Sequence, residues 1–288
     1  MEGTRPAMKL FLIGSPVRHS LSPAIYSAYF AHAGIEATYE VMEVPTRKEL
    51  PRVIEWLRRN SAGFNVTIPH KRGVVALLDE LSDKASTLGT VNAVAVVGGR
   101  LIGHNTDWLG FLRSLIMAGK TQYSKALVIG AGGAARAAVY ALAKHGEVDK
   151  LVIVSRTGTT ALALAKRAKE WGVPEALACK ASIECLRMGA TDAELIVNAS
   201  PVGMDDPTSS PLPKELIPGD CVVLDMVYRP LMTRLLREAM GRGCRVIDGL
   251  WMLAHQAAEN IRIWFGRRAD PTWLRDAAIS ATGGDHDR

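Results

Sequence analysis

The stretch KALVIGAGGAARAAVYALA (125–143) decides the fold. It runs from an apolar strand through a glycine cluster into an alanine-rich helical pattern, and GAGGAA (130–135) fits the spacing G-x-G-x-x-A. Gly130 permits a tight turn, and Gly132 lets a pyrophosphate approach the backbone at the start of the helix. A glycine cluster alone could be only a tight turn. Because a strand and a helix flank it here, the pattern favours dinucleotide binding.

Further apolar runs after this stretch alternate with helical patterns. Alternation of this kind predicts a doubly wound parallel sheet over 107–249. The expected strands are LVIVS (151–155), ELIVNAS (194–200), CVVLDM (221–226) and CRVIDG (244–249).

A second alternating series precedes it and predicts another α/β domain. Its expected strands are KLFLIG (9–14), TYEVMEV (38–44) and GFNVT (63–67), with helices from about Ser22 and Thr46. A further helix is expected from about Leu250 to Phe265. Because no strand follows it in the series, we expect this helix to return to the first domain. The prediction is an α/β protein of two domains, a discontinuous one (1–106, completed by 250–288) and a dinucleotide-binding one (107–249).

Composition agrees with a globular protein. The chain has 288 residues, of which 48% are hydrophobic and 22% charged, enough for two ordinary cores. The net charge is +6, but the basic residues are scattered, so we expect no nucleic-acid partner. No apolar run is long enough for a signal peptide or a membrane span, and only MEGTRP (1–6) and ATGGDHDR (281–288) look like frayed ends.

The four cysteines show no spacing of a zinc site or of a redox pair. They are Cys179, Cys185, Cys221 and Cys244. We therefore expect no metal and a reduced protein located in the cytoplasm.

The end of the second strand of the nucleotide-binding series indicates which dinucleotide binds. An acidic residue there would bind a ribose 2′-hydroxyl, whereas an arginine suits a 2′-phosphate. The chain reads VSRT (154–157), with Arg156 and no acid, so NADP is favoured over NAD. Ser155, Thr157 and Thr159 add hydroxyl groups. The alternative is that Arg156 is a solvated loop residue.

GFNVTIPHKRG (63–73) contains the first candidate for catalysis. Asn65 and Thr67 share one face of the expected strand, a proline then ends the ladder, and Lys71 follows. The best partner for Lys71 is Asp107 in GHNTDWLGF (103–111), at the expected start of a helix. The competing interpretation is that Thr106 or Asp107 only caps that helix.

SPVRHSLSP (15–23) places further hydroxyl groups at the end of the first strand. Ser20 and Ser22 are common N-cap residues, and Pro23 suits a first helical turn. The same hydroxyls could bind a carboxylate at the start of the helix.

Together these segments make the chain resemble the shikimate dehydrogenase family over nearly its whole length. The motifs that carry the resemblance, in sequence order, are SPVRHSLSP, GFNVTIPHK, GTVNAV, GHNTDWLGF, GAGGAARA, SRT, NASPVGM, DMVYRP and DGLWMLAHQ. The resemblance implies a substrate domain interrupted by a Rossmann domain that binds NADP, with catalysis in the cleft between them. It also implies reversible reduction of 3-dehydroshikimate to shikimate in aromatic amino-acid biosynthesis.

The resemblance also implies roles for single residues. Lys71 would be the general acid and base, with Asp107 as its partner. The residues implied to bind the substrate are Ser20, Ser22, Thr67, Asn92, Tyr228 and Gln256. Those implied to bind the cofactor are Gly130, Ala131, Gly132, Gly133 and Ala134 at the pyrophosphate, Ser155, Arg156 and Thr157 at the adenosine phosphate, and Met226, Gly249 and Met252 near the nicotinamide. The alternative for Met226 and Met252 is that they are core residues, as most methionines are.

Some positions depart from the family pattern. Where the family commonly has Asn-Arg-Thr and a further basic residue, this chain has SRT (155–157) followed by GTT (158–160). Ala93 replaces a common threonine, and Trp108 and Trp251 stand where small residues are common. These departures keep two enzyme alternatives open, namely use of NAD and action on quinate. A third alternative, a sensor without catalysis, would lack Lys71 or Asp107. The expected assembly is a monomer or a homodimer.

Overall fold

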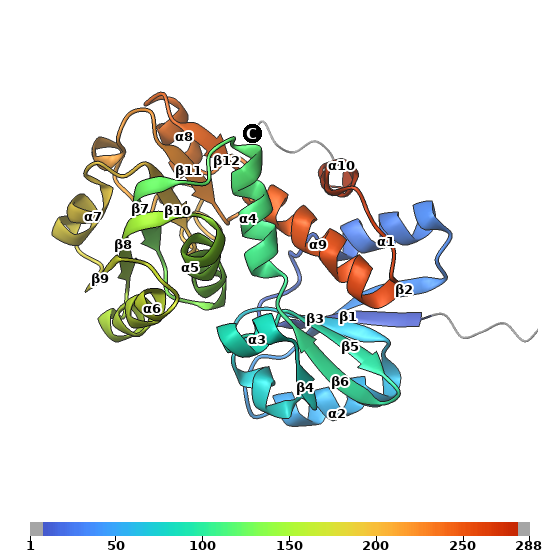
Figure 1. Cartoon of the computed structure of the whole chain (residues 1–288). Coiled ribbons are helices and arrows are strands. Elements are labelled where there is room, and N and C mark those ends of the chain that lie inside the picture. The colour runs from blue at the N-terminus through green and yellow to red at the C-terminus, as the bar shows by residue number, and fades with distance from the viewer. Residues whose placement is uncertain (1–7, 282–288) are drawn as a thin grey trace, which may run out of the picture. The chain divides into compact units, whose positions relative to one another are not determined.

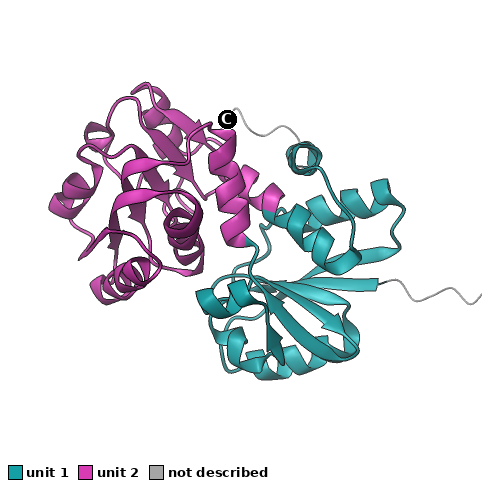
Figure 2. Cartoon of the chain, viewed as in Figure 1, with its two compact units in different colours: residues 1–106, 256–285 teal, residues 107–255, 286–288 magenta. Residues whose placement is uncertain are grey.

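The computed structural model describes residues 8–281 and divides them into two compact units (Figure 1). The first unit contains the residues up to Thr106 together with those from Gln256 onward, and the second unit is Asp107–His255 (Figure 2). The expected frayed ends lie outside the described residues, except for Ala281, which ends the last helix.

The first unit is built on a six-stranded sheet with the order β2-β1-β3-β5-β6-β4. β1 pairs in parallel with β2 and β3, whereas β5 runs antiparallel to both β3 and β6. The two-residue loop Gly98-Gly99 joins β5 to β6 with both φ angles positive, as tight hairpin turns require. The strands are β1 (Met8–Gly14), β2 (Ala37–Glu43), β3 (Gly63–Val66), β4 (Glu80–Leu81), β5 (Ala93–Val97) and β6 (Arg100–His104).

Helices cover both faces of this sheet (Figure 1). α2 packs Leu50, Ile54 and Leu57 against alternate residues of β1 and β3 in one buried cluster. On the other face the indole nitrogen of Trp264 in α9 donates to the carbonyl of Val94 at 3.0 Å. The helices of this unit are α1 (Ser22–Ala33), α2 (Leu50–Asn60), α3 (Asp83–Leu88), the 3-10 helix η1 (Gly73–Leu77), the C-terminal part of α9 (Gly249–Phe265) and α10 (Pro271–Ala281).

The expected start of the second helix at Thr46 is wrong. Thr46 begins a turn, in which its hydroxyl donates to Glu49 at 2.7 Å, and α2 begins at Leu50. Pro51 occupies the first turn of α2, where its missing N–H would have no helical partner. The fixed φ of proline therefore sets the helix start.

The second unit is also built on six strands, with the order β12-β11-β10-β7-β8-β9. All five neighbouring pairs are parallel. The order reverses between β7 and β10, which is the topological switch of a doubly wound sheet. The predicted α/β fold class is confirmed. The strands are β7 (Tyr123–Ile129), β8 (Val148–Ser155), β9 (Glu175–Lys180), β10 (Leu195–Asn198), β11 (Val222–Asp225) and β12 (Arg245–Ile247).

Helices flank this sheet as well. α7 and α8 bury Ala190, Leu235 and Leu236 against alternate residues of β7, β8, β10 and β11. The hydroxyl of Thr160 in α6 meets that of Ser155 from the opposite face of β8. The helices are α4 (Asp107–Met117), α5 (Gly133–His145), α6 (Gly158–Glu170), α7 (Ile183–Ala190), the 3-10 helix η2 (Lys214–Leu216), α8 (Arg234–Met240) and the N-terminal part of α9.

β9 and α10 are among the elements that were not predicted from the sequence. β9 (EALACK) has no β-branched residue, and α10 follows the helix that we expected to be the last. The start of α10 nevertheless has a local signal, because Asp270 accepts the backbone N–H of Thr272 at 2.9 Å and Pro271 follows it.

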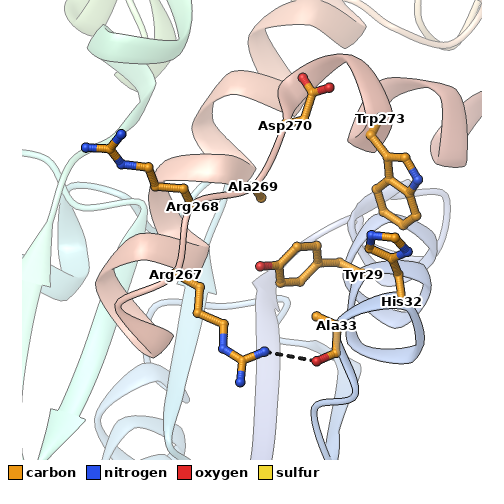
Figure 3. Close-up of a pocket in the computed structure, with 8 residues that line it drawn as sticks. All are labelled: Tyr29, His32, Ala33, Arg267, Arg268, Ala269, Asp270 and Trp273. Atoms are coloured by element: carbon orange, nitrogen blue, oxygen red, sulfur yellow. Dashed lines mark hydrogen bonds between the residues drawn. The ribbon is translucent and has the colours of Figure 1, made fainter.

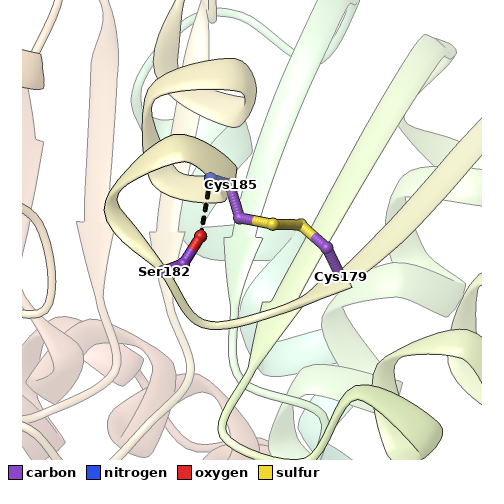
Figure 4. Close-up of a disulfide and its surroundings, with 3 residues drawn as sticks. All are labelled: Cys179, Ser182 and Cys185. Atoms are coloured by element: carbon purple, nitrogen blue, oxygen red, sulfur yellow. Dashed lines mark hydrogen bonds between the residues drawn. A yellow bond between two sulfur atoms is a disulfide. The ribbon is translucent and has the colours of Figure 1, made fainter.

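The expectation of unpaired cysteines is wrong for one pair. Cys179 in β9 and Cys185 in α7 form a disulfide, with their Cα atoms 6.3 Å apart (Figure 4). The side chain of Ser182 caps α7 by accepting the N–H of Cys185, so the turn between strand and helix brings the two sulfurs together. Cys221 and Cys244 are free and buried with Sγ atoms 3.3 Å apart, and burial raises the pKa of Cys221.

The disulfide predicts the thiol count of the purified protein. In denaturant without reductant, two thiols per chain should react with a thiol reagent, and all four cysteines should react after reduction. A C179S/C185S double variant should give two thiols in both conditions and lose about 2 kcal/mol of stability, because a short loop is no longer closed in the unfolded chain. Four reactive thiols without reductant would contradict the pairing.

Candidate active site

In the first unit the loops that follow β1 and β3 are hydrogen-bonded to each other. Ser15 donates its N–H to the carbonyl of Ile68 at 2.8 Å, and Thr67 donates to Ile13 at 2.9 Å. A Cβ atom on Gly14 would lie 2.3 Å from the Thr67 side chain, so only glycine permits this approach. The segments that contain Ser20 and Lys71 therefore leave the sheet at neighbouring strand ends.

The two predicted serines lie at the start of α1. Leu21 occupies the N-cap position, and Ser20 accepts the N–H of Ser22 on its hydroxyl at 3.2 Å. Neither serine is therefore the N-cap residue. The first turn of α1 contains no acidic residue, so the positive end of the helix dipole is not neutralised there.

Lys71 follows a buried histidine that anchors its loop. The ring of His70 bonds the carbonyl of Val44 at 2.6 Å, and the backbone of His70 bonds Thr67 and Val74. The carbonyl of Lys71 accepts the N–H of Val91, the residue before Asn92, at 2.9 Å. The Lys71 backbone is thus fixed beside the Asn92 segment, and its side chain is half-buried.

Asn92 and Gln256 meet in a buried polar network. The side-chain oxygen of Asn92 accepts the backbone N–H of Thr106 at 2.7 Å, and its amide nitrogen lies 3.4 Å from Gln256 Oε1. Asn260, one turn after Gln256 on α9, donates to Gln256 and to the Tyr26 hydroxyl at 2.9 Å each, and accepts from the Thr106 hydroxyl at 2.8 Å. Burial raises the pKa of Tyr26, so its hydroxyl stays protonated.

Thr106 also contacts a distant helix. Its hydroxyl donates to Asn260 across 154 residues of sequence, a bond that capping of α4 would not require. Asp107 follows Thr106 directly, is the first residue of α4, and has a side chain that is 4% exposed. The backbone immediately before Asp107 is therefore fixed by buried bonds.

Two further asparagines support the same segments, and neither was among the predicted site residues. Asn65 accepts the Tyr39 hydroxyl at 2.7 Å and donates to the Asn92 carbonyl at 2.8 Å. Asn105 donates to the hydroxyl of Thr90 at 2.9 Å. Their only local signal was a single amide, within an apolar strand for Asn65 and within a polar run for Asn105, and such a signal does not identify a partner.

The glycine loop of the second unit lies at the switch point of the sheet. Gly130 has φ +125°, and a Cβ atom there would lie 2.6 Å from the carbonyl oxygen of Ala199, which follows β10. Gly132 is the N-cap of α5 without a side-chain cap, and a Cβ there would meet nothing within 4 Å. The loop Gly130, Ala131, Gly132, Gly133 and Ala134 can therefore hold a pyrophosphate at the start of α5.

The loop after β8 presents polar groups at the start of α6. The Ser155 hydroxyl donates to the Thr157 carbonyl at 2.8 Å and lies 3.1 Å from the Thr160 hydroxyl. Thr157 is the N-cap, but its side chain caps nothing, and the first turn has no acid. Arg156 is exposed, as either a phosphate ligand or a solvated residue would be.

A buried carboxylate organises the loop after β11. Asp225 accepts hydrogen bonds from Asn198 at 2.9 Å, the Val227 N–H at 2.9 Å and the Thr233 hydroxyl at 2.7 Å. Burial raises the pKa of Asp225 to about 6, although these bonds oppose the shift. Asp225 directly precedes Met226, so its bonds fix the strand end from which that residue and Tyr228 follow.

Gly249 packs against this loop. A Cβ atom on Gly249 would lie 2.5 Å from the carbonyl oxygen of Met226. Met226 and Tyr228 are half-buried, whereas Met252, in the first turn of α9, is buried. The structure thus places Gly249 directly beside the Met226 carbonyl.

The two unusual tryptophans each have an aromatic neighbour within the second unit. Trp108 stacks on His145 with ring centroids 5.1 Å apart and meets Tyr140 edge-on. Trp251 lies over His255, with centroids 6.1 Å apart. Both indole rings thus take part in aromatic contacts of this unit.

A hollow of about 530 Å³ lies elsewhere in the first unit, between α1 and α10 (Figure 3). Tyr29, His32, Arg267 and Trp273 are among its lining residues, and no predicted site residue is. Arg267 donates to the carbonyl of Ala33 at 2.9 Å, which satisfies the C-terminal end of α1. The chemistry predicted from the sequence does not use this hollow.

Within residues 8–281 no three His, Cys, Asp or Glu side chains form a cluster suited to a metal ion. In the same part of the chain, no helix has the length and apolar character needed to cross a membrane.

Comparison with known proteins gives one consistent family. Residues 12–94 match the shikimate dehydrogenase substrate binding domain, and residues 249–278 match the shikimate 5′-dehydrogenase C-terminal domain. A shikimate dehydrogenase (NADP(+)) of Thermus thermophilus is 42% identical over 276 residues, which cover 96% of this chain and 99% of the relative. The chain belongs to the shikimate dehydrogenase family.

Solved structures of the shikimate dehydrogenase family share the fold. The crystal structure of the Thermus thermophilus enzyme in complex with NADP(H) and shikimate is 41% identical, with a TM-score of 0.84, and the match covers 95% of this chain and 99% of the other. A quinate dehydrogenase from Corynebacterium glutamicum in complex with NAD is 31% identical, with a TM-score of 0.84 and coverages of 95% and 99%. The fold therefore extends over dehydrogenases of different cofactor and substrate.

The raised pKa of Asp225 predicts how stability depends on pH. Between about pH 4 and pH 6 the folded protein keeps the Asp225 proton while the unfolded chain loses it, so this group stabilises the fold at acid pH and less as pH rises. Relative to D225N, which does not titrate, the protein should lose about 3 kcal/mol of unfolding free energy over this range. Urea unfolding of both proteins from pH 4 to 7 measures the difference. A difference that does not change with pH would contradict the prediction.

Proposed function

We propose that this chain catalyses the reversible, NADP-dependent reduction of 3-dehydroshikimate to shikimate, a step of aromatic amino-acid biosynthesis. The carrying observation is 42% identity over nearly the whole chain to a shikimate dehydrogenase (NADP(+)). The chain also has Lys71 and Asp107, which a sensor without catalysis would lack.

The start of α1 is suited to the carboxylate of the substrate. Ser20 and Ser22 supply hydroxyl groups there, and the helix terminus is not neutralised by an acid. Hydroxyls and helix N-termini both favour a bound anion. We assign Ser20, Ser22 and Tyr228 to the carboxylate, and Thr67, Asn92 and Gln256 to the ring hydroxyls.

Lys71 is the proposed general acid and base. When the ketone is reduced, negative charge develops on its oxygen, and the Lys71 ammonium can stabilise that charge and supply the proton. In the reverse direction the amine takes the proton from the hydroxyl. The proposed role of Asp107 is to orient Lys71 and a neighbouring substrate hydroxyl. Bound NADPH supplies the hydride that reduces the ketone carbon.

The residues of the second unit fit the cofactor. Gly130 has no room for a side chain, while the space beyond Gly132 is open at the start of α5, as a pyrophosphate requires. The end of β8 has Arg156 and no acidic residue, which supports NADP. We place Ser155, Arg156 and Thr157 at the adenosine phosphate, and Met226, Gly249 and Met252 near the nicotinamide.

The main alternative is a dehydrogenase that acts on quinate or uses NAD. The likeness to the quinate dehydrogenase bound to NAD supports it, but that protein is 31% identical against 42% for the shikimate dehydrogenase. The lack of an acid after β8 argues against NAD. We further propose a monomer or a homodimer that acts in the cytoplasm.

Steady-state kinetics with shikimate and quinate, each with NADP and NAD, test the proposal. We expect the highest kcat/KM for shikimate with NADP. A higher value for quinate or for NAD would favour the alternative, and no reduction of either cofactor would exclude a dehydrogenase.

A Lys71→Met variant should lose about a thousandfold in kcat with little change in KM, because the proton donor is needed mainly in the transition state. Lys48→Ala, which removes an exposed charge in the same unit, is the matched control and should behave as the unmodified protein. Unchanged kcat with a raised KM would restrict Lys71 to substrate binding.

A double-mutant cycle tests the proposed pair. If Asp107 acts through Lys71, the K71M/D107N double variant should be about as slow as K71M alone, because residues that act as a unit have non-additive effects. The measurement is kcat of the two single variants and the double variant. Additive losses would show that the two residues act independently.

A further inference from the structure

The end of β9 places a lysine beside the loop that follows β8. Ser155 and Lys180 are paired residues in the two parallel strands, and Ala181 donates its N–H to the Ser155 carbonyl at 2.9 Å. Lys180 is exposed. It was not among the predicted site residues, because it lies 24 residues beyond Arg156 in a strand that was not predicted.

The side chain of Lys180 leaves the sheet on the face of α6. Successive residues of a strand point to opposite faces. Cys179 points to the α7 face, where it bonds Cys185, so Lys180 points to the other face. Ser155 points the same way, because its hydroxyl meets Thr160 of α6.

Gly158 confirms this direction independently. A Cβ atom built on Gly158, the first residue of α6, would lie 3.3 Å from the Cβ of Lys180. The lysine stem therefore packs against the first residue of the helix. From there its flexible four-carbon chain is long enough to bring the ammonium to the space before the helix N-terminus.

In the described part of the chain, the cations around this helix start have no salt-bridge partner. Among the residues that the structure describes, neither Arg156 nor Lys180 forms a salt bridge, and the first turn of α6 contains no acid. At the opposite ends of the same two strands, Lys150 does pair with Glu175 at 2.8 Å. Within residues 8–281, no salt bridge therefore neutralises the charge at the α6 end.

We propose that Lys180 is, with Arg156, the second cation that holds the 2′-phosphate of NADP and so sets the preference for NADP over NAD. The inference rests on the proposed function and names a residue for its cofactor choice. A phosphate monoester has a charge of about −1.5 to −2 near neutral pH, which one arginine does not balance. Residues 158–160 contribute no charge. The 2′-hydroxyl of NAD is uncharged, so neither cation strengthens the binding of NAD.

Direct binding of NADP⁺ and NAD⁺, measured by calorimetry, tests the role without relying on turnover. Lys180→Gln should weaken NADP⁺ binding about tenfold, because one charge-assisted bond is lost at an exposed site, and should change NAD⁺ binding less than about twofold. Lys180→Arg should keep the ratio of the two dissociation constants within about threefold. Lys169→Gln is the matched control, because it removes the same charge at the far end of α6, roughly 16 Å away by helix rise.

Salt dependence gives a second readout. The NADP⁺ dissociation constant of the unmodified protein should rise with ionic strength more steeply than that of Lys180→Gln, because screening acts on each charge pair. Equal loss of NADP⁺ and NAD⁺ binding in Lys180→Gln would overturn the proposal, since Lys180 would then contact a part common to both. No loss of NADP⁺ binding would also overturn it.

The two proposals fail in different ways. If the unmodified protein does not oxidise shikimate with NADP⁺, the proposed function fails, while the ratio of dissociation constants still reports on Lys180. If shikimate is oxidised but Lys180→Gln keeps the full preference for NADP⁺, only the role of Lys180 fails. Thermal unfolding of each variant shows whether a change in cofactor binding is caused by loss of the fold. If Lys180→Gln does not fold, the binding of NADP⁺ and NAD⁺ to Lys180→Arg is compared with that of the unmodified protein instead.

Discussion

The hydrogen bond from the Thr106 N–H to the Asn92 side chain, 2.7 Å long and fully buried, is the constraint on which the proposed chemistry depends. It fixes the backbone directly before Asp107, and Val91, the residue before Asn92, donates its N–H to the Lys71 carbonyl. A buried polar group left without a partner costs about 1–3 kcal/mol, so each member of the network is held in one arrangement. Tyr26 and Asn260 complete the network from two helices, which makes the position of Gln256 a consequence of the same bonds.

In the second unit, too, a buried side-chain hydrogen bond holds two loops in place. Asn198 ends β10 and Asp225 ends β11, and their mutual bond joins the two loops on one side of the switch point. Gly130 meets the chain directly after Asn198, so the glycine loop packs against backbone that this pair holds. The raised pKa of Asp225 shows that burying this carboxylate has a free-energy cost. The three hydrogen bonds that it accepts oppose that cost and orient the loop that begins at Met226.

The sequence predicted those features that local pattern encodes. The strand, glycine turn and helix around Gly130 were predicted because spacing and residue size alone specify them, and the start of α4 at Asp107 followed from the preceding polar run. The partners of Thr106 and Asn260 were not predictable, because 154 residues separate them and neither has a distinctive neighbour. β9 was missed because EALACK has weak strand propensity and is ordered by its pairing with β8. The same omission concealed the disulfide of Cys179.

Cofactor preference illustrates why a local motif is insufficient for a charged ligand. A motif describes consecutive residues of one loop, and in this chain the loop after β8 supplies one cation, Arg156. The electrostatic field at the helix start depends instead on every charge within a few ångströms, whichever strand it comes from. In a parallel sheet the adjacent strand ends at the same edge, so a residue such as Lys180 lies beside the loop although it is remote in sequence. Since the charge of the phosphate must be balanced in space, the residues that select it are better sought across neighbouring strand ends than within the motif.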